Sequence, residues 1–316
     1  MIIIVGHVYF FSGQRFPCYD GSSEGVAKDS PMADTAHDFT SEDIEYIRHG
    51  DRPFLLRLTR PVGAGPFPFV VDAHGGAWNN SDRLSCTMRN QMWAKAGIAG
   101  AALDFRHGPD GYPTSLADIN YAIRWLKAHA AELKLDSARV GLAGASSGGH
   151  LAVLAAMRPN DTRYTAIKLD GFDARVRCFG VIGPVINPLS RYRRAVQAKQ
   201  TDNPPEWAIH IPDRHETYWK TEEAMSEGNP VLALERGEKF DLLPAFIVQG
   251  TPDVAHIYRD PDAGGGGADK NELERFTRLY KARGGDISLV YVESQELQSP
   301  QLYAPLRAFF SKHLKS

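Results

Sequence analysis

Residues 140–152 read Val-Gly-Leu-Ala-Gly-Ala-Ser-Ser-Gly-Gly-His-Leu-Ala, and they carry the strongest structural signal in the chain. The pattern predicts a short strand before this stretch and a buried helix after it, so Gly144-Ala145-Ser146-Ser147-Gly148 forms a G-x-S-x-G motif at a strand-to-helix junction. Such a turn lifts the serine hydroxyl above the sheet. It predicts Ser146 as a nucleophile and aims the Ser147 amide toward developing negative charge. The alternative is a tight turn with a purely structural role.

A second glycine motif precedes the first in the sequence. His74-Gly75-Gly76-Ala77-Trp78 directly follows an apolar run that is typical of a buried strand. Glycines let backbone N–H groups approach a substrate oxygen, so the amides of residues 75–77 and of Ser147 are expected to form an oxyanion hole. The alternative is a glycine turn with Trp78 packed in the core. His74 is expected to hydrogen-bond the backbone and fix this loop rather than act as a base.

Short β-rich runs alternate with longer helical patterns from residue 44 onward. This alternation implies right-handed βαβ crossovers and a mainly parallel sheet covered on both faces. The expected strands are 45–48, 54–58, 68–73, 98–105, 139–143, 176–182, 245–248 and 287–292, and the expected helices are 115–131, 148–157, 270–283 and 302–314.

Three segments depart from this alternation. Residues 188–240 are long, polar and aromatic without a clear strand, so we expect an inserted cap over the carboxyl ends of the strands. The four consecutive glycines at 264–267 have high backbone entropy and predict a flexible surface loop. A phosphate-binding loop is not expected there, because no strand leads into it and no GK[ST] follows. Residues 1–38 are interpreted as an N-terminal arm or an upstream extension of a domain spanning 39–316. A short added strand and loop is the alternative for this arm.

Composition excludes several classes of protein. The 316 residues include 38 acids and 36 bases, and this balance argues against nucleic acid or an anionic membrane as the main partner. A hydrophobic fraction of 43% is too high for a disordered chain, and no apolar run approaches the ~20 residues of a membrane span. The cysteines, at positions 18, 86 and 178, fit neither a disulfide framework nor a CxxC metal site. They favour a reducing compartment, and we expect a cytoplasmic protein.

These motifs resemble those of the α/β-hydrolases of the carboxylesterase type. The chain looks close to the hormone-sensitive-lipase-like esterases, the acetylxylan/feruloyl esterases and the kynurenine-formamidase-like hydrolases. The resemblance rests on HGGAW at 74–78, on GASSGGHLA at 144–152 and on the run from Tyr112-Pro113 to Trp125-Leu126. It implies an eight-stranded, mostly parallel sheet with helices on both faces and an inserted cap. It also implies hydrolysis of a small-molecule ester or amide without a cofactor, and it makes His150 a helix-packing residue.

The sequence offers one candidate for the acid of the site but leaves several explanations open for the base. The resemblance implies that Asp253 orients the catalytic histidine. Asp253 follows a predicted strand and the Gly250-Thr251 pair. The family places that histidine after the next strand, where this chain has Glu293-Ser294-Gln295-Glu296 and no histidine. Either His256 is the base, or Glu296 acts with a pKa raised by burial. In the third explanation the fold serves as a lyase, or as an inactive ligand-binding protein.

The cap and its surroundings supply candidates for substrate binding. Trp78, Trp207, Tyr218 and Trp219 are predicted to line an apolar pocket, and the alternative is a small core within the cap. The arginines at 191, 193 and 194 form either a solvated face or a site for an anionic substrate group. The other histidines lack ligand spacing, so no metal site is expected. The expected partner is a small-molecule ester or amide, and a homodimer is possible.

Overall fold

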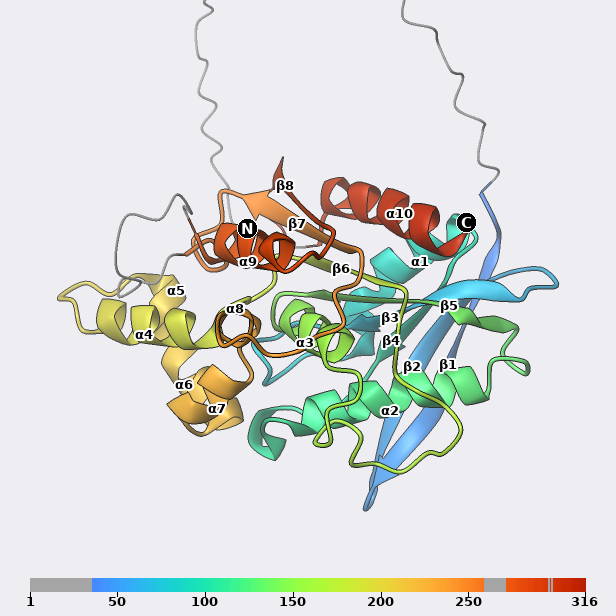
Figure 1. Cartoon of the computed structure of the whole chain (residues 1–316), viewed down its shortest axis with the longest axis horizontal. Helices are drawn as coiled ribbons and strands as arrows, with labels where there is room; N and C mark the ends of the chain where they lie inside the picture. The colour runs from blue at the N-terminus through green and yellow to red at the C-terminus, as the bar shows by residue number, and fades with distance from the viewer. Residues whose placement is uncertain (1–35, 259–270, 295, 297) are drawn as a thin grey trace, which may run out of the picture. The chain divides into compact units, whose positions relative to one another are not determined.

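The computed structural model describes residues 36–258, 271–294, 296 and 298–316 (Figure 1). Residues 36–316 form one compact unit. Almost all of the predicted N-terminal arm at 1–38 lies outside the described residues, and so does the glycine run 264–267.

An eight-stranded, mostly parallel sheet forms the centre of this unit, which confirms the expected fold class. The strand order is β1-β2-β4-β3-β5-β6-β7-β8. The first two strands form an antiparallel hairpin, β2 is antiparallel to β4, and the other neighbours are parallel. The strands are β1 (Phe39–His49), β2 (Arg52–Pro61), β3 (Phe67–Ala73), β4 (Ala99–Leu103), β5 (Leu135–Ala145), β6 (Cys178–Ile182), β7 (Ala245–Thr251) and β8 (Ile287–Glu293).

The central strands are buried on both faces, whereas the edges are exposed. Every residue of β4 and β6 is buried, while β1 is mostly exposed. Parallel strands covered on both sides have continuous apolar sequences, which explains why these runs were recognisable in the sequence. Parallel pairing also brings the carboxyl ends of β3, β5, β6 and β7 to one edge of the sheet, where the predicted site residues follow.

Helices cover both faces of the sheet. The two helices α1 and α10 pack on one face, and α2, α3 and α9 pack on the other (Figure 1). The sequence did not predict α1, because its buried residues include Arg89 and Asn90 beside Trp93 and Ala94 and therefore form no apolar stripe. The bounds are α1 (Thr87–Lys95), α2 (Thr114–Ala128), α3 (Ser147–Met157), α9 (Glu272–Ala282) and α10 (Pro300–Leu314), with 3-10 turns η1 (Arg83–Cys86) and η2 (Gly108–Asp110).

The segment between β6 and β7 consists of helices and loops. As expected for residues 188–240, it contains no strand. Figure 1 shows α4, α5, α6 and α7 gathered at the end of the unit away from the β1–β2 hairpin. These helices are α4 (Pro188–Lys199), α5 (Glu206–Ile209), α6 (Ile211–Trp219), α7 (Glu222–Glu227) and α8 (Pro230–Glu235).

The C-terminal helix packs closely on the sheet. Phe310 is fully buried, and a Cβ placed on Gly141 of β5 would lie 2.9 Å from its ring. The missing side chain therefore lets α10 approach the strand. Among the described residues, the helices are too short or too polar to cross a bilayer.

Candidate active site

Ser146 occupies a strained turn between β5 and α3. Its backbone has φ 55° and ψ −122°, a conformation that costs a non-glycine residue about 1–3 kcal/mol. Its amide donates to the Ile182 carbonyl at 2.9 Å, and its carbonyl accepts from the Val185 amide at 3.2 Å. The end of β6 therefore holds the turn that presents the Ser146 hydroxyl at the carboxyl edge of the sheet.

Gly148 allows the helix after this turn to pack against the neighbouring strand. A Cβ at this position would lie 2.2 Å from the His74 carbonyl oxygen and 2.3 Å from that of Ala73. These distances are too short for any side chain, so α3 can begin directly beside the end of β3 only because residue 148 is glycine.

A continuous hydrogen-bonded chain runs from Ser146 through His256 to Asp253. The Ser146 Oγ lies 2.9 Å from His256 Nε2, and His256 Nδ1 lies 2.8 Å from Asp253 Oδ2. His256 is thus the candidate base that contacts the serine. Glu296, the other candidate, has an exposed side chain, and in the described parts of the chain it forms no hydrogen bond with Ser146 or Asp253.

Asp253 is held by several donors. The amides of Ala255 and His256 donate to its Oδ1 at 2.9 and 3.0 Å, and Gln249 Nε2 donates to its Oδ2 at 3.1 Å. Burial raises the pKa of Asp253, but the hydrogen bonds from His256 and from the two amides outweigh it and hold the pKa below its ordinary value. The carboxylate is therefore ionised near neutral pH.

Gln249 was not singled out in the sequence. It is fully buried near the end of β7, four positions before Asp253, and its side-chain oxygen has no partner among the described residues. A polar side chain next to the apolar run 245–248 was the available signal, because a buried amide needs a hydrogen-bond partner.

The glycine loop after β3 lies beside the serine. A Cβ on Gly75 would lie 3.3 Å from Ser146 Cβ. The Trp78 amide donates to Ser147 Oγ at 3.0 Å, which ties this loop to the start of α3. In the part of the chain that the structure describes, the amides of Gly75, Gly76, Ala77 and Ser147 have no hydrogen-bond acceptor. The described residues therefore leave these four amides without an acceptor.

His74 bonds the backbone, as expected. Its Nδ1 lies 2.9 Å from the Gly75 carbonyl oxygen, and its ring stacks on Phe105 with 4.2 Å between centroids. Burial lowers the pKa of His74 to about 4. The ring is neutral at physiological pH and serves to fix the loop.

His150 connects α3 to the segment between β6 and β7. Its Nε2 donates to the Gly228 carbonyl at 2.7 Å, and its Nδ1 accepts from Trp78 Nε1 at 3.3 Å. Burial lowers the pKa of His150 to about 4. This residue is a packing residue, as the resemblance implied.

The aromatic residues expected to line a pocket are instead packed inside the protein. Trp78, Tyr218 and Trp219 are each at most 1% exposed, and the Trp78 ring lies 5.4 Å from Trp219 and 5.9 Å from Tyr218. Their role as pocket-lining residues is therefore corrected to a buried aromatic cluster. Trp207 is half-buried, and the Arg194 guanidinium lies 4.1 Å above its ring.

A cavity of about 270 Å³ opens beside Ser146. Small and polar residues surround it, so it offers hydrogen bonds rather than a long apolar channel. Its lining consists of Gly75, Gly76, Asn80, Ser81, Ser85, Arg89, Ala145, Ser146 and Gln298.

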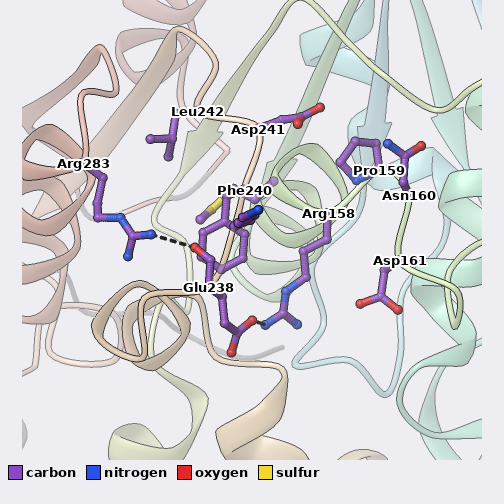
Figure 2. A pocket seen from close by; sticks show the side chains of 11 residues that line it. Arg158, Pro159, Asn160, Asp161, Glu238, Phe240, Asp241, Leu242 and Arg283 are labelled. Carbon is purple, nitrogen blue, oxygen red and sulfur yellow. Dashed lines mark hydrogen bonds and ion pairs between the residues drawn. The ribbon is translucent and has the colours of Figure 1, made fainter.

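A larger cavity of about 800 Å³ lies at the other end of α3 (Figure 2). Its two arginines already have partners, since Arg158 Nη2 donates to Glu238 Oε2 at 2.6 Å and Arg283 Nη2 donates to the Glu238 carbonyl at 2.8 Å. None of Ser146, His256 and Asp253 lines it. Size alone therefore does not locate the candidate active site. No cluster of three or more acidic, histidine or cysteine side chains suited to a metal ion occurs within the described ranges.

Comparisons with known proteins show which sequences and folds this chain is similar to. A family model described as BD-FAE matches residues 58–199. The probable carboxylic ester hydrolase LipM of Mycobacterium tuberculosis is 34% identical over 137 residues, which are 42% of this chain and 31% of LipM. The chain spans about a third of the length of the first curated relatives that it matches.

Solved esterase structures share the fold. The structure of the Thermogutta terrifontis esterase Est2 has a TM-score of 0.63 and 19% identity, and the match covers 86% of this chain and 90% of Est2. The carboxylesterase EstE1 from a metagenomic library has a TM-score of 0.64 and 21% identity, over 90% of this chain and 91% of EstE1.

The sheet order, the strained serine turn and the solved structures define the class of fold: the chain has the α/β-hydrolase fold. In sequence, part of the chain is similar to proteins named as carboxylic ester hydrolases and esterases.

Proposed function

We propose that this protein is a serine hydrolase that cleaves a carboxylic ester, or a related amide, of a small molecule. The observation that carries the proposal is the chain of hydrogen bonds from Ser146 Oγ to His256 Nε2 and from His256 Nδ1 to Asp253. A serine next to a base that is itself oriented by a carboxylate is the arrangement that nucleophilic acyl transfer requires. The described relatives named as ester hydrolases support the same reaction class.

In the first half of the reaction, Ser146 Oγ attacks the substrate carbonyl carbon while its proton passes to His256 Nε2. The carbonyl oxygen becomes an anion, and the amides of Gly75, Gly76, Ala77 and Ser147 would stabilise it. Asp253 remains ionised and stabilises the imidazolium of His256. The imidazolium then gives its proton to the leaving alcohol, the carbon–oxygen bond breaks, and an acyl-enzyme on Ser146 remains.

In the second half, water attacks the acyl-enzyme. His256 takes a proton from the water and returns it to Ser146 Oγ as the ester bond to the enzyme breaks. The carboxylic acid leaves and the starting state is restored, so atoms and charges balance without a cofactor. The helices of residues 188–240 would act as a cap above this edge of the sheet.

The test follows release of 4-nitrophenol from 4-nitrophenyl acetate by stopped-flow absorbance. Wild type should show a burst followed by steady turnover, and Ser146→Ala should lose both. Removal of one member of a triad lowers kcat by about a thousandfold or more, so His256→Ala should lose at least that much activity. Glu296→Gln is the matched control, because it neutralises the other candidate base and should retain wild-type rates.

Two results would contradict the proposal. A wild-type protein that hydrolyses neither short esters nor amides would favour a lyase or a ligand-binding member of the fold. Equal rates in wild type and His256→Ala would remove His256 from the mechanism even if Ser146 were essential.

A further inference from the structure

Arg191 is a buried cation that forms no ion pair with a carboxylate of the described residues. It lies in α4 and is 6% exposed. Its Nε donates to the Ala255 carbonyl at 3.1 Å, whereas its Nη1 is buried without any hydrogen-bond partner among the described residues. Burying a charge costs much free energy unless the charge is paired. A hydrogen-bond acceptor placed at Nη1 would therefore stabilise this guanidinium.

Two further positive charges, those of Arg194 and Arg214, lie near Arg191 and would also favour an anion there. The Arg194 Nη1 donates to the Val254 carbonyl at 2.9 Å, and neither Arg194 nor the exposed Arg214 forms an ion pair with a described residue. Burial lowers the pKa of Arg191 to about 10; nearby Tyr258 and Asp253 oppose this shift, and the charges of Arg214 and Arg194 add to it. The side chain still carries its charge near neutral pH. Arg193 differs from these residues, because it pairs with Glu222 at 2.7 Å.

The unpaired guanidinium is adjacent to the catalytic loop. Arg191 contacts Ala255, and the next residue, His256, contacts the Ser146 hydroxyl. The nearby carboxylate of Asp253 is already bonded to His256, Gln249 and two amides. The described residues therefore offer Arg191 no free anion, although its partner Ala255 directly precedes His256 in the sequence.

We propose that Arg191 is a specificity residue that binds a carboxylate carried by the ester substrate. This inference rests on the proposed function of Ser146 and deepens it by defining the substrate class as anionic esters. A guanidinium matches a carboxylate in both shape and charge, and Nη1 supplies the donor that the described residues leave unused. The charges of Arg194 and Arg214 attract the same anion from solution.

Two matched pairs of esters test the proposal, since the carboxylate could belong to either half of the substrate. The acyl-side pair is mono-4-nitrophenyl glutarate against 4-nitrophenyl pentanoate, and the alcohol-side pair is 4-acetoxybenzoate against phenyl acetate. Wild type should prefer the anionic member of at least one pair by about tenfold or more in kcat/KM, as expected for a charge-assisted hydrogen bond.

The variant Arg191→Met should abolish this preference, read as the ratio of the two kcat/KM values. The matched control Arg193→Met removes a charge from the same helix and should retain the ratio, because Arg193 is already paired. Equal kcat/KM for both members of each pair in wild type would overturn the inference and leave the esterase proposal intact. An equal loss on both members in Arg191→Met would also overturn it, because it would show that Arg191 only positions the loop.

A binding measurement separates this inference from the hydrolase proposal. Ser146→Ala cannot turn over, so its thermal midpoint is measured with glutarate and with 4-hydroxybenzoate. At least one of these anions should raise the midpoint, and the double variant Ser146→Ala/Arg191→Met should show no rise. A rise that is equal in both proteins, or no rise with either anion, would refute anion binding at Arg191 whether or not the wild type is an esterase.

Discussion

Three histidines close to Ser146 have different hydrogen-bond partners, and these partners decide what each ring can do. His74 and His150 bond backbone carbonyls in buried surroundings and stay neutral. His256 instead bonds a carboxylate on one side and the serine hydroxyl on the other. A carboxylate favours the imidazolium that must form during acyl transfer, so only His256 combines the right position with the right partner.

His150 should make stability dependent on pH. Its pKa is about 4 in the folded protein and near its ordinary 6.5 when unfolded, so the unfolded chain binds the proton first as pH falls. The unfolding free energy should therefore decrease from pH 6.5 toward pH 4, by about 3 kcal/mol for this one group. In His150→Gln this decrease should be correspondingly smaller. Urea unfolding across that range provides the measurement.

The control for this prediction is His210→Gln, which alters an exposed side chain and should keep the wild-type pH dependence. If wild type and His150→Gln lose stability in parallel as pH falls, burial of the neutral ring is not the cause.

At the same scale, some site residues could be predicted from the sequence and others could not. Ser146 and the 75–77 loop were identifiable because strained turns and close backbone approach require glycines at fixed spacing. His256 stayed one of several candidates, because an isolated histidine in a loop carries no local pattern. The Arg191 contact with Ala255 joins segments distant in sequence, so only the folded chain shows it.

Among the helices and strands, the junction of β5 and α3 depends on glycine. Gly148→Ala would place a methyl group 2.2 Å from the His74 carbonyl oxygen, where only backbone displacement can relieve the clash. We expect a loss of about 3 kcal/mol or more in unfolding free energy, above the usual range for overpacking because the obstacle is backbone. Hydrolysis should fall too, since the same shift moves Ser146 away from residues 75–77.

Gly149→Ala is the matched control. Its Cβ would lie 3.1 Å from the Pro184 Cβ, a contact that a shift of a few tenths of an ångström can relieve. Chemical denaturation and 4-nitrophenyl acetate turnover of both variants test the comparison. Equal effects at the two positions would contradict the proposed packing of α3 against β3.

Helices and strands that are buried through apolar side chains were predicted from the sequence more accurately than the others. Buried parallel strands and amphipathic helices were placed to within a few residues, because their apolar patterns reflect coverage by neighbours. The helix α1 was missed because Arg89 and Asn90 are buried through hydrogen bonds to Asp72, at 2.9 and 3.0 Å, rather than through apolar contacts. The aromatic residues of α6 were misread, since tryptophan and tyrosine occur both in pockets and in cores.

For the molecule as a whole, α10 closes one face of the sheet. Phe310 is fully buried against Trp93 and lies over Gly141 and Gly180. Phe310→Ala should lower the unfolding free energy by about 3–5 kcal/mol, because it leaves a cavity between helix and sheet. Equilibrium unfolding in urea measures this loss.

Phe309→Ala provides the comparison, because its ring is only partly buried. It should cost clearly less than Phe310→Ala. Similar losses for the two variants would show that α10 does not pack through Phe310 as the structure describes.

The turn at residues 253–256 has a consequence for engineering. Because Asp253 and His256 lie within four residues of each other, the acid and the base of the proposed triad belong to one contiguous segment. One exchange of these four residues would therefore replace both proposed partners of Ser146 together.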